Sequence, residues 1–217
     1  AHVSLTDKLP LARSRIDRDA LSRKIPGFLE ELWSSPATAV VVIWRGEALI
    51  APGPNAQLAI FAPADIPRFR HRIYLGLTTE DNRALAAGTS FIVAVVDDEV
   101  GESLEPDVTR WMSARTLAHT LDDLDSGVVI EALAMANWHD AHAFSPSTGA
   151  VTAESQAGWT RVDSETGKDI FPRTDAAVIV LITDAHDRIV WGVMRSGNHT
   201  ATPCWPDLSS RGSRLKR

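Results

Sequence analysis

The chain has 217 residues, of which 44% are hydrophobic and 23% charged, as in an ordinary globular protein with room for one large or two smaller cores. A net charge of −6 argues against general attraction to nucleic acid or to an anionic membrane, and no apolar run is long enough to span a bilayer. The single cysteine, Cys204, excludes an internal disulfide, and the first eight residues lack a secretory signal pattern, so we expect a cytoplasmic protein.

The first half of the sequence predicts a small α+β domain at residues 1–125. Helical spacing of apolar residues predicts helices, and β-branched runs predict strands, in this chain order: a helix at 17–33, strands at 38–44, 48–51, 72–77 and 90–96, and a helical stretch at 110–121. Pro26 predicts a break or a new start inside the first helix. The acidic residues at 97–99 are interpreted as a solvated turn after a strand.

A long helix is expected at residues 127–143, and we treat 126–143 as a helix that links the first domain to the ribbon-like segment after it. Its predicted core positions are Val128, Ile130, Leu133, Ala134 and Trp138. The aspartates that precede it are interpreted as turn and N-cap residues, namely Asp122, Asp123 and Asp125.

The next segment, residues 145–168, is rich in Ser, Thr and Gly and shows no clear period. It holds Trp159 between two similar turn signals, each ending in Thr-Gly, and this predicts a ribbon over 144–173. An apolar strand at 176–183 and its partner at 188–194 predict a hairpin over 174–195, after which residues 196–217 show no period.

Several short motifs are specific as a set: Ala-Met-Ala-Asn-Trp-His at 134–139, Phe144, Gly-Trp at 158–159, and Ile-Phe-Pro-Arg-Thr-Asp at 170–175 before an apolar strand. Together they resemble the NADH pyrophosphatases, a family of Nudix hydrolases. The resemblance implies an α+β fold with an N-terminal domain, a zinc ribbon and the start of an α/β/α Nudix domain. It also implies a homodimer that uses magnesium or manganese to split NADH or NAD into nicotinamide mononucleotide and AMP, and in some members to remove NAD caps from RNA.

In that family four cysteines of the ribbon hold zinc. The matching positions here are Ser145, Thr148, Asp163 and Thr166. Zinc in proteins is held by cysteine sulfur or histidine nitrogen, and hydroxyl groups do not replace thiolates around it. We therefore predict a degenerate ribbon without zinc, held by local hydrogen bonds and by packing of Trp159.

The family also binds its dinucleotide partly with an aromatic residue just before the first strand of the catalytic domain. That position falls on Phe171 here, and a phenylalanine keeps the face for stacking without the hydroxyl of a tyrosine. The alternative interpretation is a plain core or junction residue, which is the commoner role of an aromatic side chain.

The catalytic signature of the family, the Nudix box, has no match in the sequence, so we expect no catalytic residue in this chain. Codons permitted by residues 202–216, when read from the third base, encode the approach to that box. We therefore interpret 196–217 as an out-of-frame tail of a truncated Nudix domain. This leaves three hypotheses: an inactive truncation product, a non-catalytic nucleotide-binding or dimerisation module, or part of a working enzyme.

His139 and His142 lie three residues apart on the predicted long helix, with Asp140 between them. They could form a metal pair. No third ligand is evident in the sequence, so we favour capping or surface histidines, because isolated histidines are usually structural.

Overall fold

The computed structural model describes residues 14–117, 119–175 and 183. The chain divides into two compact units, residues 1–173 and 174–217, and every named helix and strand lies in the first. The predicted hairpin at 174–195, apart from residues 174, 175 and 183, and the predicted tail at 196–217 lie outside the described residues. The domain boundaries expected at residues 125 and 143 stay predictions.

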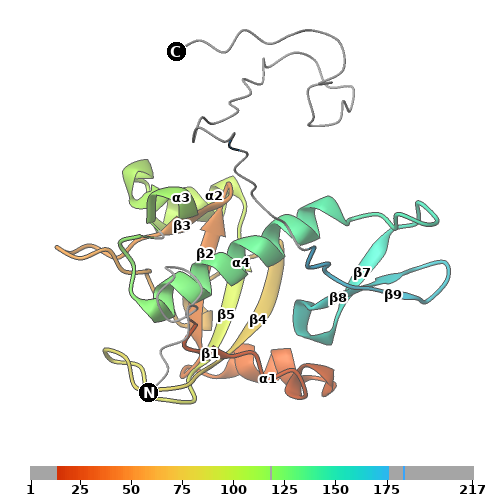
Figure 1. The fold of residues 1–217 in the computed structure, drawn as a ribbon, viewed down its shortest axis with the longest axis horizontal. Helices are drawn as coiled ribbons and strands as arrows, with labels where there is room; N and C mark the ends of the chain where they lie inside the picture. The colour runs from red at the N-terminus through yellow and green to blue at the C-terminus, as the bar shows by residue number, and fades with distance from the viewer. Residues whose placement is uncertain (1–13, 118, 176–182, 184–217) are drawn as a thin grey trace, which may run out of the picture. The chain divides into compact units, whose positions relative to one another are not determined.

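The first unit is an α+β fold, as expected. Its elements follow in chain order: β1 (Ile16–Asp17), η2 (Ser22–Lys24), α1 (Phe28–Ser34), β2 (Ala39–Trp44), β3 (Glu47–Leu49), η3 (Pro63–Asp65), β4 (His71–Thr78), β5 (Ser90–Val95), α2 (Asp98–Leu104), η4 (Val108–Arg110), β6 (Trp111–Met112), α3 (Ala114–Leu117), α4 (Asp123–Ala141), β7 (Thr152–Ser155), η5 (Gln156–Gly158), β8 (Thr160–Asp163) and β9 (Asp169–Ile170). Six strands form one sheet in the order β1-β4-β5-β2-β3-β6, and β7-β8-β9 form a second sheet (Figure 1).

The centre of the large sheet is the parallel pair β2 and β5, which is flanked by antiparallel neighbours. All six residues of β2 are buried, because both faces of the sheet are covered. A strand covered on both faces has the continuous apolar sequence that Ala39–Trp44 shows. One core cluster includes Val41, Ile43 and Phe91, and the other includes Val40, Val42 and Trp111.

The long helix α4 crosses one face of the large sheet (Figure 1) and buries Val128, Val129 and Ala132 against it. Asp122 is its N-cap and accepts a hydrogen bond from the backbone N–H of Asp125, as the sequence predicted. Asp125 itself is fully buried, which the turn interpretation did not anticipate. Ala134 is exposed, so that predicted core position is wrong.

Two of the expected helices are wrong in part. Residues 17–33 contain β1, a short 3-10 turn and then α1, which begins at Phe28 just after Pro26, as a break at that proline implies. Two of the apolar residues in the expected helix, Leu21 and Ile25, are exposed. The stretch 110–121, which was expected to be helical, holds the strand β6 before the short helix α3. Residues 97–99, which were interpreted as a turn, are the N-cap and first turn of α2. Within the described residues no helix is both long and apolar enough to cross a membrane.

Candidate functional site

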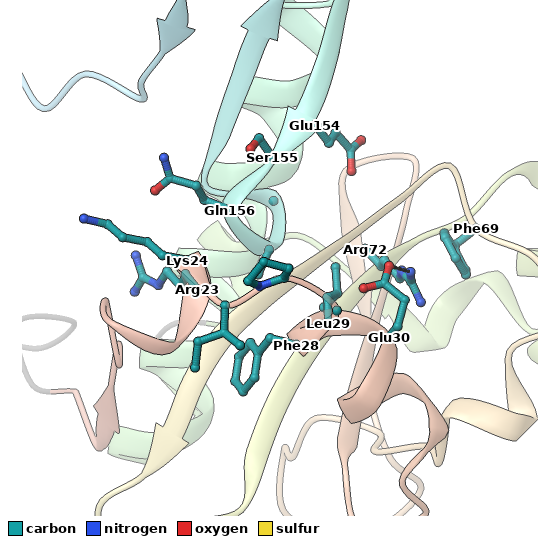
Figure 2. Close-up of a pocket in the computed structure, with 15 residues that line it drawn as sticks. Arg23, Lys24, Phe28, Leu29, Glu30, Phe69, Arg72, Glu154, Ser155 and Gln156 are labelled. Atoms are coloured by element: carbon teal, nitrogen blue, oxygen red, sulfur yellow. Dashed lines mark hydrogen bonds and ion pairs between the residues drawn. The ribbon is translucent and has the colours of Figure 1, made fainter.

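A pocket of about 540 Å³ opens where the β7–β8 turn meets the segment that leads into α1. Its walls are residues 23–30, two side chains next to or on β4, and residues 154–158. Figure 2 shows Arg23 and Lys24 at one end of this pocket and Arg72 with Glu30 at the other. Glu30 pairs with Arg72 at 2.6 Å, so that end carries compensated charge.

Trp159 anchors the turn that forms one wall. Its indole N–H donates to the backbone carbonyl of Tyr74 at 2.5 Å, and the guanidinium of Arg23 lies 3.5 Å from the centroid of its ring. Gly158 lies so close to β4 that an added Cβ would stand 2.8 Å from Cγ1 of Ile73, and its φ of +88° is in the left-handed region. Glycine fits both conditions at this turn.

A partly buried polar network lies beside the pocket and joins β4, α4, β7 and β8; His139 and Arg161 are buried in it, and Glu154 is exposed. Nε2 of His139 donates to the carbonyl of Gly158 at 2.7 Å, because a carbonyl can only accept. Nδ1 of His139 therefore accepts, and Nη1 of Arg161 donates to it at 2.8 Å. The His71 ring stacks on the His139 ring with 5.0 Å between centroids, and its Nδ1–H donates to Glu154.

Both titratable groups at the centre of this network have shifted pKa values. Burial lowers the pKa of His139, although the Gly158 carbonyl and the charge of Glu154 act in the opposite direction. Burial alone would raise the pKa of Glu154, but the hydrogen bond from His71 and the charges of His139, His71 and Arg161 bring it below its usual range. At neutral pH the network therefore holds a neutral His139 and an ionised Glu154.

Three of these residues could serve as metal ligands. His71, His139 and Glu154 each offer one ligand atom, and these atoms lie within 4.8 Å of one another. Two imidazoles and a carboxylate form a donor set that zinc accepts. Arg161 opposes this use, because its Nη1 occupies the lone pair of His139 and lies 3.7 Å from Oε1 of Glu154. Because the guanidinium of Arg161 already supplies a positive charge to these side chains, the cluster fits a structural network better than a metal centre.

The four positions that correspond to zinc ligands lie in two turns, residues 145–149 and 163–167, which we call the first and second knuckles. They have the same backbone pattern. In the first knuckle, the backbone N–H of Ser145 donates to the carbonyl of Ala150 at 2.8 Å, and that of Gly149 donates to the carbonyl of Ser145 at 2.9 Å. In the second knuckle, the backbone N–H of Asp163 donates to the carbonyl of Lys168 at 3.0 Å, and that of Gly167 donates to the carbonyl of Asp163 at 2.8 Å. Both glycines have left-handed φ angles, +78° and +68°.

Asp163 links the two knuckles. Its Oδ2 accepts the hydroxyl of Thr148 at 2.6 Å, and its Oδ1 accepts the backbone N–H groups of Glu165 and Thr166 at 2.8 and 2.9 Å. The side chain is buried. Hydrogen bonds from Ser145 and Thr148, followed by those from the backbone, hold the pKa of this carboxyl far below its usual range. Thr166 uses its hydroxyl differently and accepts from its neighbour Lys168 at 3.4 Å.

Phe171 follows β9, and this residue is 57% exposed. This exposure contradicts the interpretation as a core residue, and the interpretation as a junction residue stays a prediction. The role of Phe171 in stacking on a nucleotide stays a prediction.

The structure brings Ser145, Thr148 and Asp163 together, as the resemblance to the family's ribbon implied, whereas the hydroxyl of Thr166 bonds Lys168. The surface interpretation of His139 is wrong, because this side chain is buried and bonded through both nitrogens. Sequence reasoning missed its partners His71, Glu154 and Arg161. No local pattern marks them, since His71 is 68 residues from His139 and joins it only through sheet pairing and helix packing.

The chain was compared with protein-family models and with curated proteins, and both comparisons found similar sequences. Residues 37–138 match the family described as the NADH pyrophosphatase-like rudimentary NUDIX domain. Two similar relatives, from Mycobacterium tuberculosis (strain ATCC 25618 / H37Rv) and Mycobacterium bovis (strain ATCC BAA-935 / AF2122/97), are each named NAD-capped RNA hydrolase NudC. Each is 33% identical over 178 residues, which is 82% of this chain and 51% of the relative.

The chain thus spans about half the length of the curated relatives it matches. Residues 37–138 therefore belong to the family of NADH pyrophosphatase-like rudimentary NUDIX domains, and the chain is similar to NudC over 178 residues.

Proposed function

We propose that this chain forms the N-terminal part of a hydrolase that splits the pyrophosphate of NADH or NAD into nicotinamide mononucleotide and AMP, including NAD caps on RNA. The observation that carries the proposal is the continuous similarity to NudC, which extends over 178 residues and beyond the rudimentary NUDIX domain. By the same resemblance we propose a cytoplasmic protein and a homodimer.

We further propose that residues 1–217 by themselves do not catalyse this reaction. Pyrophosphate cleavage needs divalent ions, magnesium or manganese in this family, that neutralise the phosphates and activate the attacking water. Those ions need clustered carboxylates, and the sequence contains no Nudix box to supply them. Among the described residues the one candidate cluster, His71, His139 and Glu154, has a single carboxylate and faces Arg161.

A second candidate function is a non-catalytic module that binds a nucleotide or forms a dimer. The exposed ring of Phe171 favours nucleotide contact, because aromatic faces stack on bases. Light scattering coupled to size-exclusion chromatography separates the dimerisation role from the others. A monomer at all concentrations would remove the dimerisation role.

The activity proposal is tested by the release of AMP from NADH in the presence of magnesium or manganese. The purified chain is expected to show no turnover, and NudC of M. tuberculosis serves as the positive control. A gene in which the frame is restored at codon 196 is expected to encode an active enzyme. Chelator-sensitive turnover by residues 1–217 alone would contradict the proposed inactivity, and a soluble but inactive repaired protein would contradict the out-of-frame interpretation.

A further inference from the structure

The family implies a zinc ion between the two knuckles, and the donors present do not fit one. Zinc is bound by thiolates, imidazole nitrogens or carboxylates that turn lone pairs toward a common point. Here the positions hold three hydroxyl groups and one carboxylate. The Thr148 hydroxyl directs its proton, not a lone pair, to Asp163, and the Thr166 hydroxyl accepts from Lys168 N–H.

The lone pairs of the carboxylate are also already used. One oxygen of Asp163 takes the Thr148 hydroxyl of the first knuckle, and the other takes two backbone N–H groups of the second. The Ser145 hydroxyl of the first knuckle also helps to lower the pKa of this carboxyl, and its oxygen lies 3.1 Å from the hydroxyl oxygen of Ser147. A buried carboxylate is costly unless it is fully hydrogen-bonded, and these donors meet that requirement.

We propose that the Asp163 carboxylate takes the structural place of the metal and closes the two knuckles as an anionic centre. The charge pattern is the inverse of a zinc site. A metal centre is one cation surrounded by electron-pair donors, whereas here one anion is surrounded by O–H and N–H donors. Charge-assisted hydrogen bonds are about twice as strong as neutral ones, which suits a single group that must hold two turns together. The proposal concerns folding of this segment and does not depend on the enzymatic activity proposed above.

The first test changes the charge while keeping the shape. Asp163→Asn in the full chain replaces an acceptor oxygen with an NH₂ group that faces other donors. We expect protease cleavage within residues 144–168 to accelerate by roughly 5- to 150-fold, because an unsatisfied buried group costs about 1–3 kcal/mol. Asp169→Asn is the matched control, since Asp169 is an exposed carboxylate on β9, and its cleavage rate should stay that of the original chain.

A milder variant covers the case in which Asp163→Asn does not fold. Thr148→Val removes one hydroxyl donor and keeps the side-chain volume, so it should accelerate the same cleavage by a smaller factor. Equal cleavage rates for Asp163→Asn, Thr148→Val and Asp169→Asn would overturn the proposal.

The second test measures metal directly. The original chain should contain no stoichiometric zinc by elemental analysis, and a chelator should not alter its protease resistance. The quadruple variant Ser145→Cys, Thr148→Cys, Asp163→Cys and Thr166→Cys should bind one zinc ion and become sensitive to chelator, because it restores four thiolates to the same backbone frame. The proposal is overturned if the original chain holds one zinc ion whose removal exposes 144–168 to protease, or if the four-cysteine variant binds none.

Discussion

Nη1 of Arg161 lies 2.8 Å from Nδ1 of His139, so a permanently charged donor faces an imidazole nitrogen that must stay unprotonated. Proton uptake at His139 would place two N–H donors against each other in a buried site. The lowered pKa of His139 is consistent with this conflict, with burial as its largest cause.

The first prediction is a loss of stability in mild acid. The folded pKa of His139 lies below the unfolded value of about 6.5, so its stabilising contribution is complete above about pH 6.5 and declines as the pH falls toward the folded value. Urea midpoints should therefore fall between about pH 7.5 and about pH 5.5, which is above the range where Glu154 takes up a proton.

The variant His139→Gln should flatten that pH dependence, because glutamine does not titrate. His142→Gln is the matched control, since the ring of this half-buried histidine bonds the Trp138 carbonyl and packs on the Trp138 ring, and it has no bond to Arg161. If His139→Gln and the original chain keep the same slope against pH, the assignment of the slope to His139 is wrong.

The second prediction concerns the internal cation. Arg161→Met removes the guanidinium that bonds His139 and Thr152, and it should destabilise the chain by about 2–5 kcal/mol because buried partners lose their hydrogen bonds. The same change removes the cation that faces two of the three possible ligands, His139 and Glu154. We expect nickel or zinc to bind this variant at least about tenfold more tightly than the original chain in calorimetry.

Arg70→Met is the control for that experiment, because Arg70 is an exposed arginine that pairs with Asp140 nearby. It should leave both stability and metal affinity almost unchanged. Tight metal binding by the original chain, equal to that of Arg161→Met, would show that Arg161 does not block the cluster.

The third prediction separates two left-handed glycines. Gly149→Ala should cost about 1–2 kcal/mol, the strain of a left-handed alanine, because nothing lies within 4 Å of the added Cβ. Gly158→Ala should cost about 1–3 kcal/mol more, because its Cβ would meet Ile73 at 2.8 Å. Chemical denaturation of both variants checks the difference, and equal costs would mean that the turn is not pressed against β4.

The fourth prediction addresses Phe171. Phe171→Ala should weaken binding of NADH by roughly 2- to 10-fold in a fluorescence titration, in line with about 0.5–1.5 kcal/mol for an aromatic stacking contact. Phe171→Tyr should retain binding. Because the residue is exposed, neither change should alter stability by more than about 0.5 kcal/mol. Unchanged affinity in Phe171→Ala would remove Phe171 from the site.

The central strands of the large sheet could be predicted, because a strand that is buried on both faces has a continuous apolar sequence of its own. Ala39–Trp44 and Ser90–Val95 are β-branched runs, and burial on both faces requires that continuous pattern. The prediction of one helix over residues 17–33 was wrong because the local pattern there did not reflect burial. Its apolar residues have helical spacing, yet Leu21 and Ile25 face solvent, so spacing alone did not report a buried face.

The knuckles could be located from sequence because each turn carries its own Thr-Gly signal. The buried polar groups could not, since their partners come from distant parts of the chain. Asp125 shows why: its carboxylate accepts the backbone N–H of Leu58 at 2.9 Å and also bonds Arg83. From the sequence alone, Asp125 was interpreted as a turn or N-cap residue before the long helix.

The atoms that close the two knuckles include no sulfur. The side-chain groups are the hydroxyls of Ser145 and Thr148 and the carboxylate of Asp163, and the rest are backbone amides. Thiolates oxidise to disulfides and sulfenic acids and then release their metal, whereas hydroxyl and carboxylate groups undergo no such reaction. The order of this segment is therefore independent of the redox state of its surroundings, and peroxide has no target among the groups that hold it.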